Sequence, residues 1–510
     1  MSAPAARPPR RRAGSPKTAA VVDVGSNSVR LVLYRIEGRT IWPMHNEKVL
    51  AGLGRDLPST GRLSADGLAL ALPALRRYAA IIRASRPEAL FAVATAAVRE
   101  AADGRVFVDR VRAETGLALE VLDGTEEARA SALGVIAGAP TAAGVAADLG
   151  GGSLELSKLK GGRAGAGVSV PLGPFSLASP GKFSVSEARP KIAAVLESLA
   201  PAYRASCLSA VGGAWRSLAV VHMKLTDYQL EIIHQYRLSR REALELCRFV
   251  QLQSRSSLER IEGVAKRRVD TLPHAALVLE ELIGALELKE VVISAFGLRE
   301  GLLYDAMTPA IRRRDPLVEG CRVLASGAGD DGLGAAVAAW IADPFSRLEP
   351  LFDGRDGLLL EAACALADLG ARLHPDHRAD LVFDQVLRAP VGGASHAERG
   401  YLACAAFARH TGAAVVRAPN LIGRLLSSER LQRAQALGAA IRLACELSGR
   451  APSLLKRARL DFDGGRMLLR AEADFAPLLL AEQIAKRAAT LAERLDMDLS
   501  IKPLPDKDAA

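Results

Sequence analysis

The fold is decided by residues 145–157, which read VAADLGGGSLELS. This stretch predicts an apolar strand that ends near Asp148, a turn of three glycines and a serine, and a second strand from about Leu154. Glycines let several backbone N–H groups point into one small space, and such a nest binds phosphate oxygens. A carboxylate beside a phosphate is repelled unless a divalent cation lies between them. Asp148 is therefore a candidate Mg²⁺ ligand.

A second copy of the pattern stands near the start of the chain, where residues 21–31 read VVDVGSNSVRL. Asp23 takes the place of Asp148, and the two aspartates are separated by about the length of one domain. One such unit is weak support, because Asp and Gly are common in ordinary β-hairpins. Two copies at this spacing favour duplicated lobes that clamp a phosphate. The candidate phosphate-binding residues are Ser26, Asn27 and Ser28 in one turn and Gly150, Gly151, Gly152 and Ser153 in the other.

Length and composition indicate a soluble globular protein of three or four domains, with 510 residues of which 49% are apolar. The six cysteines show no metal-ligand spacing, which favours buried thiols in a reducing compartment, and so the cytoplasm. No apolar run is long enough to span a membrane, and residues 18–22 are too short for a signal-peptide core. The net charge of +10 suits an anionic substrate.

The first seventeen residues form a basic tail that is rich in Pro, Ala and Arg and contains no acidic residue. This composition predicts disorder for residues 1–17. The tail is either an electrostatic contact for a polyanion or a solvated leader without a role.

Two further candidates follow predicted strands. Residues 89–94 predict a short buried strand, and ligands of open α/β sheets bind beyond the carboxyl ends of strands, so Arg99 is placed to reach an anion. The alternative is a helix-surface arginine. Thr125 is predicted to cap the next helix, and the helix dipole alone would explain Glu126 and Glu127 in its first turn. The functional alternative is that one glutamate is the general base for a water that attacks phosphorus.

Six motifs resemble, in order, those of the Ppx/GppA exopolyphosphatase and guanosine pentaphosphatase family. They occupy residues 21–33, 93–99, 122–129, 147–155, 211–219 and 295–304. The family is part of the actin-like ATPase superfamily, in which two lobes each carry a ribonuclease-H-like sheet with a phosphate turn. The resemblance therefore implies an α/β fold with such lobes at residues 18–136 and 137–311.

The resemblance also implies roles for single residues. Glu127 matches the catalytic base, and Arg99 matches the arginine that contacts the terminal phosphate. Asp148, Glu155 and Asp23 match the acids that bind Mg²⁺ or another divalent cation. Arg268 matches a recurrent arginine, in a basic run at residues 266–268 that is either a wall for a polyanion or a solvated face.

The function that the resemblance implies is hydrolysis of the terminal phosphate of inorganic polyphosphate by an exopolyphosphatase. The alternatives are a guanosine pentaphosphate 5′-phosphohydrolase and a non-catalytic regulator that binds polyphosphate or guanosine penta- and tetraphosphate. A sugar kinase is disfavoured, because Trp215 would be bulky in the turn that holds adenosine in such kinases. The resemblance implies a homodimer. It implies no nucleic-acid partner and no membrane partner.

The second half of the chain is predicted to be helical from residue 315 to 450, with Pro and Gly breaks between helices. Longer family members carry an HD-like helical domain here. Its His-Asp metal motif is absent, because residues 365–368 read ALAD, so we expect a metal-free scaffold. Residues 453–505 predict a hairpin, a helix and a strand, which make a small α/β C-terminal cap.

Overall fold

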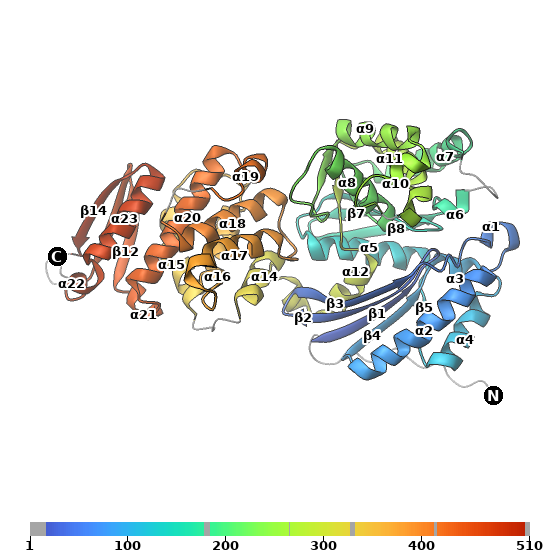
Figure 1. Cartoon of the computed structure of the whole chain (residues 1–510), viewed down its shortest axis with the longest axis horizontal. Helices are drawn as coiled ribbons and strands as arrows, with labels where there is room; N and C mark the ends of the chain where they lie inside the picture. The colour runs from blue at the N-terminus through green and yellow to red at the C-terminus, as the bar shows by residue number, and fades with distance from the viewer. Residues whose placement is uncertain (1–16, 178–183, 265, 327–331, 413–415, 505–510) are drawn as a thin grey trace. The chain divides into compact units, whose positions relative to one another are not determined.

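The structure, a computed structural model, describes residues 17–177, 184–264, 266–326, 332–412 and 416–504. It confirms a mixed α/β fold and divides into two compact units, residues 1–314 and 315–510. Figure 1 shows the course of the chain. The predicted basic tail lies outside the described residues, apart from Lys17. Within the described residues, no helix has the length and apolar character needed to cross a bilayer.

The first sheet of unit 1 has five strands in the order β3-β2-β1-β4-β5. They are β1 (Thr18–Val24), β2 (Val29–Glu37), β3 (Thr40–Val49), β4 (Ala89–Ala94) and β5 (Glu120–Val121). Four helices interrupt them: α1 (Leu57–Thr60), α2 (Ala65–Ser85), α3 (Ala96–Glu100) and α4 (Gly104–Thr115). Helix α2 begins after Ser64, whose side chain accepts a hydrogen bond from the Gly67 N–H, and its apolar face packs on the sheet.

The second sheet has six strands in the order β10-β11-β9-β6-β7-β8. They are β6 (Gly144–Leu149), β7 (Leu154–Lys160), β8 (Arg163–Val170), β9 (Cys207–Val211), β10 (Arg237–Ser239) and β11 (Glu290–Ile293). The helices of this part are α5 (Gly124–Gly138), α6 (Pro174–Leu177), α7 (Val185–Tyr203), α8 (Gly213–Leu225), α9 (Arg240–Leu252), α10 (Arg255–Glu259), the 3₁₀ helix Lys266–Thr271, α11 (Leu272–Ala285), α12 (Leu298–Ala306) and α13 (Pro309–Arg312).

The two copies of the sequence pattern have the same local structure. In each, an antiparallel hairpin is closed by a turn hydrogen bond, from Gly25 N to Ser28 O at 3.0 Å and from Gly150 N to Ser153 O at 2.9 Å. In each, the first strand also pairs in parallel with a later strand, β1 with β4 and β6 with β9. The aspartates occupy equivalent positions near the ends of β1 and β6, so both turns lie at the same edge of their sheets, where ligands bind in α/β folds.

Helices α5 and α12 lie between the two sheets (Figure 1), where their apolar side chains share one core with β1 and β6. The two helices touch backbone to backbone. A Cβ atom added to Gly301 would overlap the carbonyl oxygen of Ala130, and one added to Gly134 would overlap that of Gly297. This contact fixes the start of α5 relative to the start of α12, and both starts contribute to the site described below.

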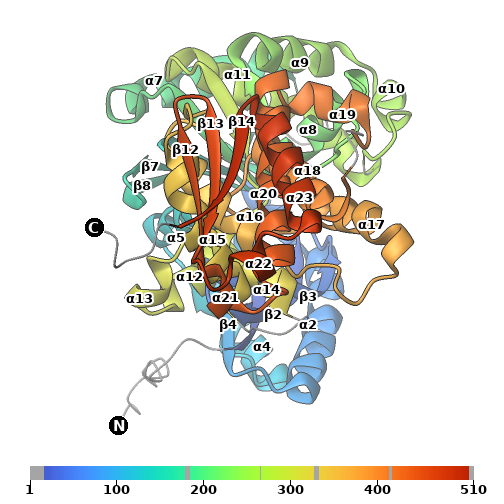
Figure 2. The ribbon, with the colours of Figure 1, turned by 90° about the vertical axis from the view of Figure 1, so that its left-hand side faces the viewer.

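Unit 2 is a helical block followed by a three-stranded sheet. Its helices are α14 (Pro316–Ala325), α15 (Leu333–Ser346), α16 (Asp356–Ala365), α17 (Pro375–Arg388), α18 (His396–His410), α19 (Pro419–Leu425), α20 (Ser428–Leu447), α21 (Pro452–Leu455), α22 (Ala476–Leu479) and α23 (Glu482–Leu495). Strands β12 (Ala458–Asp463), β13 (Arg466–Ala471) and β14 (Asp498–Pro503) lie side by side (Figure 2), with β14 parallel to β13.

The helix contact predicts a large steric effect of a single methyl group. Gly301→Ala should lower the free energy of unfolding by about 1–3 kcal/mol or more, because backbone cannot yield as a flexible side chain does. Gly284→Ala is the matched control: it lies near the end of α11, has no atom within 4 Å of the added Cβ, and should be neutral or stabilise by up to about 1 kcal/mol. Urea unfolding measures both. Equal stability of the two variants would contradict the contact.

Candidate functional site

Both phosphate turns line one cleft in unit 1. The predicted residues in its lining are Asp23, Ser26, Asn27, Ser28, Glu127, Asp148, Gly150, Gly151, Ser153, Glu155 and Arg268. Arg99 and Gly152 are not part of the lining.

The two turns touch each other. A Cβ atom added to Gly151 would lie 3.1 Å from the Cβ atom of Asn27, and one added to Gly152 would lie 3.0 Å from Oγ of Ser26. A side chain at either glycine would therefore force the opposite turn to shift by a few tenths of an ångström. Glycine permits the close approach of the two chain segments.

Neighbouring loops hold the carbonyl groups of both turns and leave their N–H groups available. The carbonyl oxygens of Ser26, Asn27, Gly151 and Gly152 each accept a backbone hydrogen bond; the respective donors are Gly54, Gly52, Phe175 and Gly173, at 2.9–3.1 Å. The N–H groups of the same four residues have no acceptor among the residues described. N–H groups that two adjacent turns leave without an acceptor are candidate donors to a bound anion.

Helix α5 separates the two glutamates that the sequence left open. Asp123 is the N-cap and accepts from the N–H groups of Thr125 and Glu126 at 2.8 Å, while Glu126 accepts from the Asp123 N–H at 2.9 Å. The prediction that Thr125 caps the helix is wrong, because the Asp123 carboxylate reaches the first turn and places Thr125 inside the helix. This capping contact explains why a glutamate stands at position 126 without a catalytic role. Glu127 is buried and lines the cleft.

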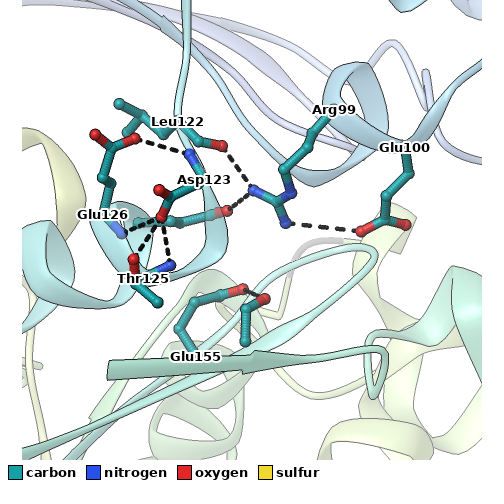
Figure 3. Close-up of polar contacts among 9 residues, drawn as sticks. Arg99, Glu100, Leu122, Asp123, Thr125, Glu126 and Glu155 are labelled. Atoms are coloured by element: carbon teal, nitrogen blue, oxygen red, sulfur yellow. Dashed lines mark hydrogen bonds and ion pairs between the residues drawn. The ribbon is translucent and has the colours of Figure 1, made fainter. Parts of the chain in front are cut away.

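Arg99 contacts Glu127, because its Nη1 donates to Oε2 of Glu127 at 3.0 Å. Figure 3 shows two further contacts of the same guanidinium group, from Nη1 to the Leu122 carbonyl oxygen at 2.9 Å and from Nη2 to Oε1 of Glu100 at 3.6 Å. Burial raises the pKa of Glu127 to about 7; Arg99 opposes the shift, and Asp148 adds to it. Because Arg99 is engaged in this way, its predicted phosphate contact stays a prediction.

Asp148 and Glu155 are carboxylates that are bound by serine hydroxyl groups and not by a cationic side chain of the described residues. Ser131, one turn beyond Glu127 on α5, donates a short hydrogen bond to Oδ2 of Asp148, and Ser169 donates to Oε1 of Glu155 at 2.8 Å. Neither carboxylate has an ion-pair partner within the described parts of the chain. Burial raises the pKa of both, and for Glu155 the charges of Glu127 and Asp148 raise it further.

Asp23 differs from Asp148, because Arg299 neutralises it. Nη1 of Arg299 lies 2.7 Å from Oδ2 of Asp23, and both side chains are largely buried. Glu300 fixes this region: it accepts from the Tyr34 hydroxyl at 2.7 Å and from the Gly297 N–H at 3.0 Å. Sequence reasoning missed the role of Arg299, although the residue lies inside the last of the six motifs.

Five cations form what we call the cationic wall of the cleft: Arg30, Lys48, Arg216, Arg268 and Arg299. Their crowding is visible at Lys48, whose pKa is lowered to about 7 by burial and by the neighbouring guanidinium groups, that of Arg268 first. Sequence reasoning predicted only Arg268. Strand alternation could have indicated Arg30, which is the cross-strand partner of Asp23. Lys48 and Arg216 come from β3 and α8, and only the tertiary fold brings them together.

The expectation that Trp215 obstructs the glycine turn at residues 212–213 is wrong. Trp215 is fully buried in the core beneath α8, and its Nε1 donates to the Ala275 carbonyl oxygen at 3.0 Å. Arg268 covers the turn instead, because a Cβ atom added to Gly213 would overlap its guanidinium group. An adenosine in this turn would have to displace a cation, not an indole.

The carboxylate oxygens of Asp148 and Glu155 suit a hard divalent cation. The two residues are cross-strand partners of the β6–β7 hairpin and line the same cleft. Within the described residues no group of three or more His, Cys, Asp or Glu side chains is arranged as a metal site. The donor set therefore fits a cation that takes one or two protein carboxylates and completes its shell with phosphate oxygens and water, as Mg²⁺ does.

The sequence is similar to those of known protein families and of individual proteins. A sequence profile described as "Ppx/GppA phosphatase family" matches residues 32–310, and one described as "Exopolyphosphatase, C-terminal" matches residues 355–500. Exopolyphosphatase 1 of Mycobacterium bovis is 29% identical over 330 residues, covering 60% of this chain and 91% of the relative. Exopolyphosphatase 2 of Mycobacterium tuberculosis is 30% identical over 298 residues, covering 53% and 91%.

The chain is also similar to solved structures. A Ppx/GppA family member from Aquifex aeolicus superposes with a TM-score of 0.50 at 26% identity, covering 56% of this chain and 96% of the other. An exopolyphosphatase from Cytophaga hutchinsonii superposes with a TM-score of 0.53 at 24% identity, covering 57% and 99%, which shows a shared fold.

Proposed function

The chain belongs to the Ppx/GppA phosphatase family, and we propose that it is an exopolyphosphatase, a hydrolase that removes the terminal phosphate of inorganic polyphosphate as orthophosphate. One observation carries the proposal: two touching phosphate turns, a buried glutamate and the cationic wall line the same cleft. The names of the mycobacterial relatives support the same substrate class.

In this proposal the terminal phosphoryl group lies against the free N–H groups of both turns, which stabilise the charge of the transition state. Glu127 accepts the proton of the attacking water as the new O–P bond forms. The bridging P–O bond then breaks, and the shortened chain leaves with that oxygen. A general base works best with a pKa near the working pH, and Glu127 has a pKa of about 7. Arg99 holds the Glu127 carboxylate in place.

Asp148 and Glu155 would hold the divalent cation, with Mg²⁺ as the proposed metal. When bound, it supplies positive charge that screens the phosphate oxygens from the carboxylates and polarises the phosphorus. Asp23 is less available as a ligand because Arg299 already pairs with it. We therefore propose that Asp23 positions Arg299 at the phosphate turn.

The cationic wall favours a chain of phosphates over a nucleoside. A polyphosphate carries about one negative charge on every phosphate, so the groups behind the terminal one meet the wall. Arg268 covers the glycine turn at Gly213, which leaves no preformed space for a base there. Guanosine pentaphosphate hydrolysis uses the same catalytic residues, and it stays the alternative that a substrate comparison decides.

We also propose that helices α14–α20 form an HD-like scaffold without its metal, and that β12–β14 with α23 form the C-terminal cap. The match of residues 355–500 to the exopolyphosphatase C-terminal profile supports this. Asp368, the acid of the incomplete metal motif, is paired with Arg450. The homodimer and the domain limits given above stay predictions.

Replacing the proposed base should separate chemistry from binding. Glu127→Gln keeps the size of the side chain but cannot accept the proton, so kcat for phosphate release from long-chain polyphosphate with Mg²⁺ should fall by about 10²–10⁴-fold, with KM nearly unchanged. Glu126→Gln is the matched control, since that glutamate caps the helix; its kcat should stay within about twofold of wild type.

Equal phosphate release by Glu127→Gln and wild type would contradict the proposed role of Glu127 as the general base. Release by the wild type from guanosine pentaphosphate, with none from polyphosphate, would replace the proposed substrate by the nucleotide.

Lys48 predicts a pH dependence of KM. Its pKa is lowered to about 7, so the charged form that attracts phosphate is present below about pH 7 and lost above it. KM for polyphosphate should rise by up to about tenfold per pH unit above 7 in the wild type. Lys48→Met should show a high KM with a flatter profile, and Lys48→Arg, which stays charged, a low and flat one. Parallel profiles of all three proteins would show that Lys48 does not contact substrate.

A further inference from the structure

Two serine hydroxyl groups bind the carboxylates that the proposed metal would use. Ser131 donates a short hydrogen bond to Oδ2 of Asp148, and Ser169 donates to Oε1 of Glu155 at 2.8 Å. The serines come from α5 and β8, whereas the carboxylates are cross-strand partners on β6 and β7. A hydrogen bond to one carboxylate oxygen fixes the rotation of the group and leaves other lone pairs for a cation.

The hydroxyl of Ser131 uses an acceptor outside its own helix. A serine within a helix can donate to the carbonyl oxygen four residues earlier, as Ser217 of α8 does to Gly213 at 3.1 Å. Ser131 instead donates to Asp148, which lies at the end of β6. The serine is only 2% exposed, so water hardly competes for this contact. The hydroxyl therefore sets the direction of a carboxylate rather than satisfying the backbone of α5.

Ser169 is set in place by the same helix. It is the register partner of Glu155 on the neighbouring strand. A Cβ atom added to Gly124, the first residue of α5, would lie 2.6 Å from the Cβ atom of Ser169. A Cβ atom added to Gly167 of β8 would lie equally close, 2.6 Å, to that of Ala128 of α5. Helix α5 therefore packs directly on β8 around Ser169.

Glu127, the proposed base, lies on α5 between these two contacts. Gly124 is three residues before it and Ser131 is four residues after it, and residues at this spacing share one face of a helix. One face of α5 thus carries the base, donates to Asp148 through Ser131, and supports the serine that donates to Glu155.

We propose that Ser131 and Ser169 are positioning residues of the metal site, which hold Asp148 and Glu155 in the orientation that binds the divalent cation. This inference rests on the proposed function, because it takes these two carboxylates as the metal ligands. Without its serine, a carboxylate is free to rotate and binds the cation less tightly. Groups that orient metal ligands in this way typically contribute about 10–100-fold to metal affinity.

Binding of Mn²⁺ to the full chain without substrate tests the inference, because electron paramagnetic resonance of the free ion measures affinity independently of catalysis. Mn²⁺ prefers the same oxygen ligands as Mg²⁺. Ser131→Ala and Ser169→Ala should each raise the Kd for Mn²⁺ by about 10–100-fold. Ser169→Thr keeps the hydroxyl group at a half-buried position of an edge strand, so it should restore the wild-type Kd.

Ser157→Ala is the matched control. Ser157 is also fully buried, but its hydroxyl donates to the Gly165 carbonyl oxygen at 3.2 Å, so its removal should leave the Kd unchanged. Asp148→Asn should abolish the binding that the serine variants weaken, which assigns the measured ion to the cleft. Thermal unfolding checks that every variant is folded.

An unchanged Kd in both alanine variants, or an equal rise in Ser157→Ala, overturns the inference. A Kd that Asp148→Asn leaves unchanged also overturns it, because the ion then binds elsewhere. Phosphate release from polyphosphate by the wild type is measured separately. Release without a shift of Kd in the serine variants refutes the role of the serines and leaves the proposed function standing, whereas a shifted Kd without release does the reverse.

Discussion

The contact between the two phosphate turns is the constraint on which the site depends. Gly151 and Gly152 lie so close to Ser26 and Asn27 that an added Cβ atom would be only 3.0–3.1 Å from their atoms. Because each turn ends a strand of a different sheet, this contact fixes the two lobes of unit 1 relative to each other. It brings N–H donors from both copies into one small space and sets Glu127, at the start of the connecting helix, beside them.

The electrostatics of the cleft follow from this arrangement. The cleft is lined by buried carboxylates and by the cationic wall. Glu127 and Asp23 are paired with Arg99 and Arg299, whereas Asp148 and Glu155 have no ion-pair partner within the described residues. The pKa of Glu155 is raised and that of Lys48 is lowered, which are opposite effects of the same two causes, burial and like charge. A polyanion together with a divalent cation relieves both. A cationic ligand would relieve only the carboxylates, and a neutral ligand would relieve neither group. The charge pattern therefore favours a polyanion that binds together with a divalent cation.

Much of this site could be predicted from sequence, and the limits have physical reasons. The turns and their aspartates depend on local turn chemistry and strand periodicity, so they were found, and the family match confirms the resemblance that the motifs indicated. Asp123 as the N-cap was missed although it is a local feature, because the spacing of Asp123 and Glu126 is that of a capping box. The core position of Trp215 and the roles of Lys48 and Arg299 were missed for another reason: they depend on where a side chain points after segments far apart in sequence have packed, and no local pattern records that.

The most direct test of the account is a crystal structure of the Glu127→Gln protein with tripolyphosphate and Mg²⁺. The terminal phosphate should accept hydrogen bonds, at about 2.7–3.2 Å, from N–H groups of both turns, at residues 26–27 and 151–152, with the rest of the chain along the cationic wall. A terminal phosphate bound to one turn alone, or outside the cleft, would contradict the claim that the paired turns form the phosphate site.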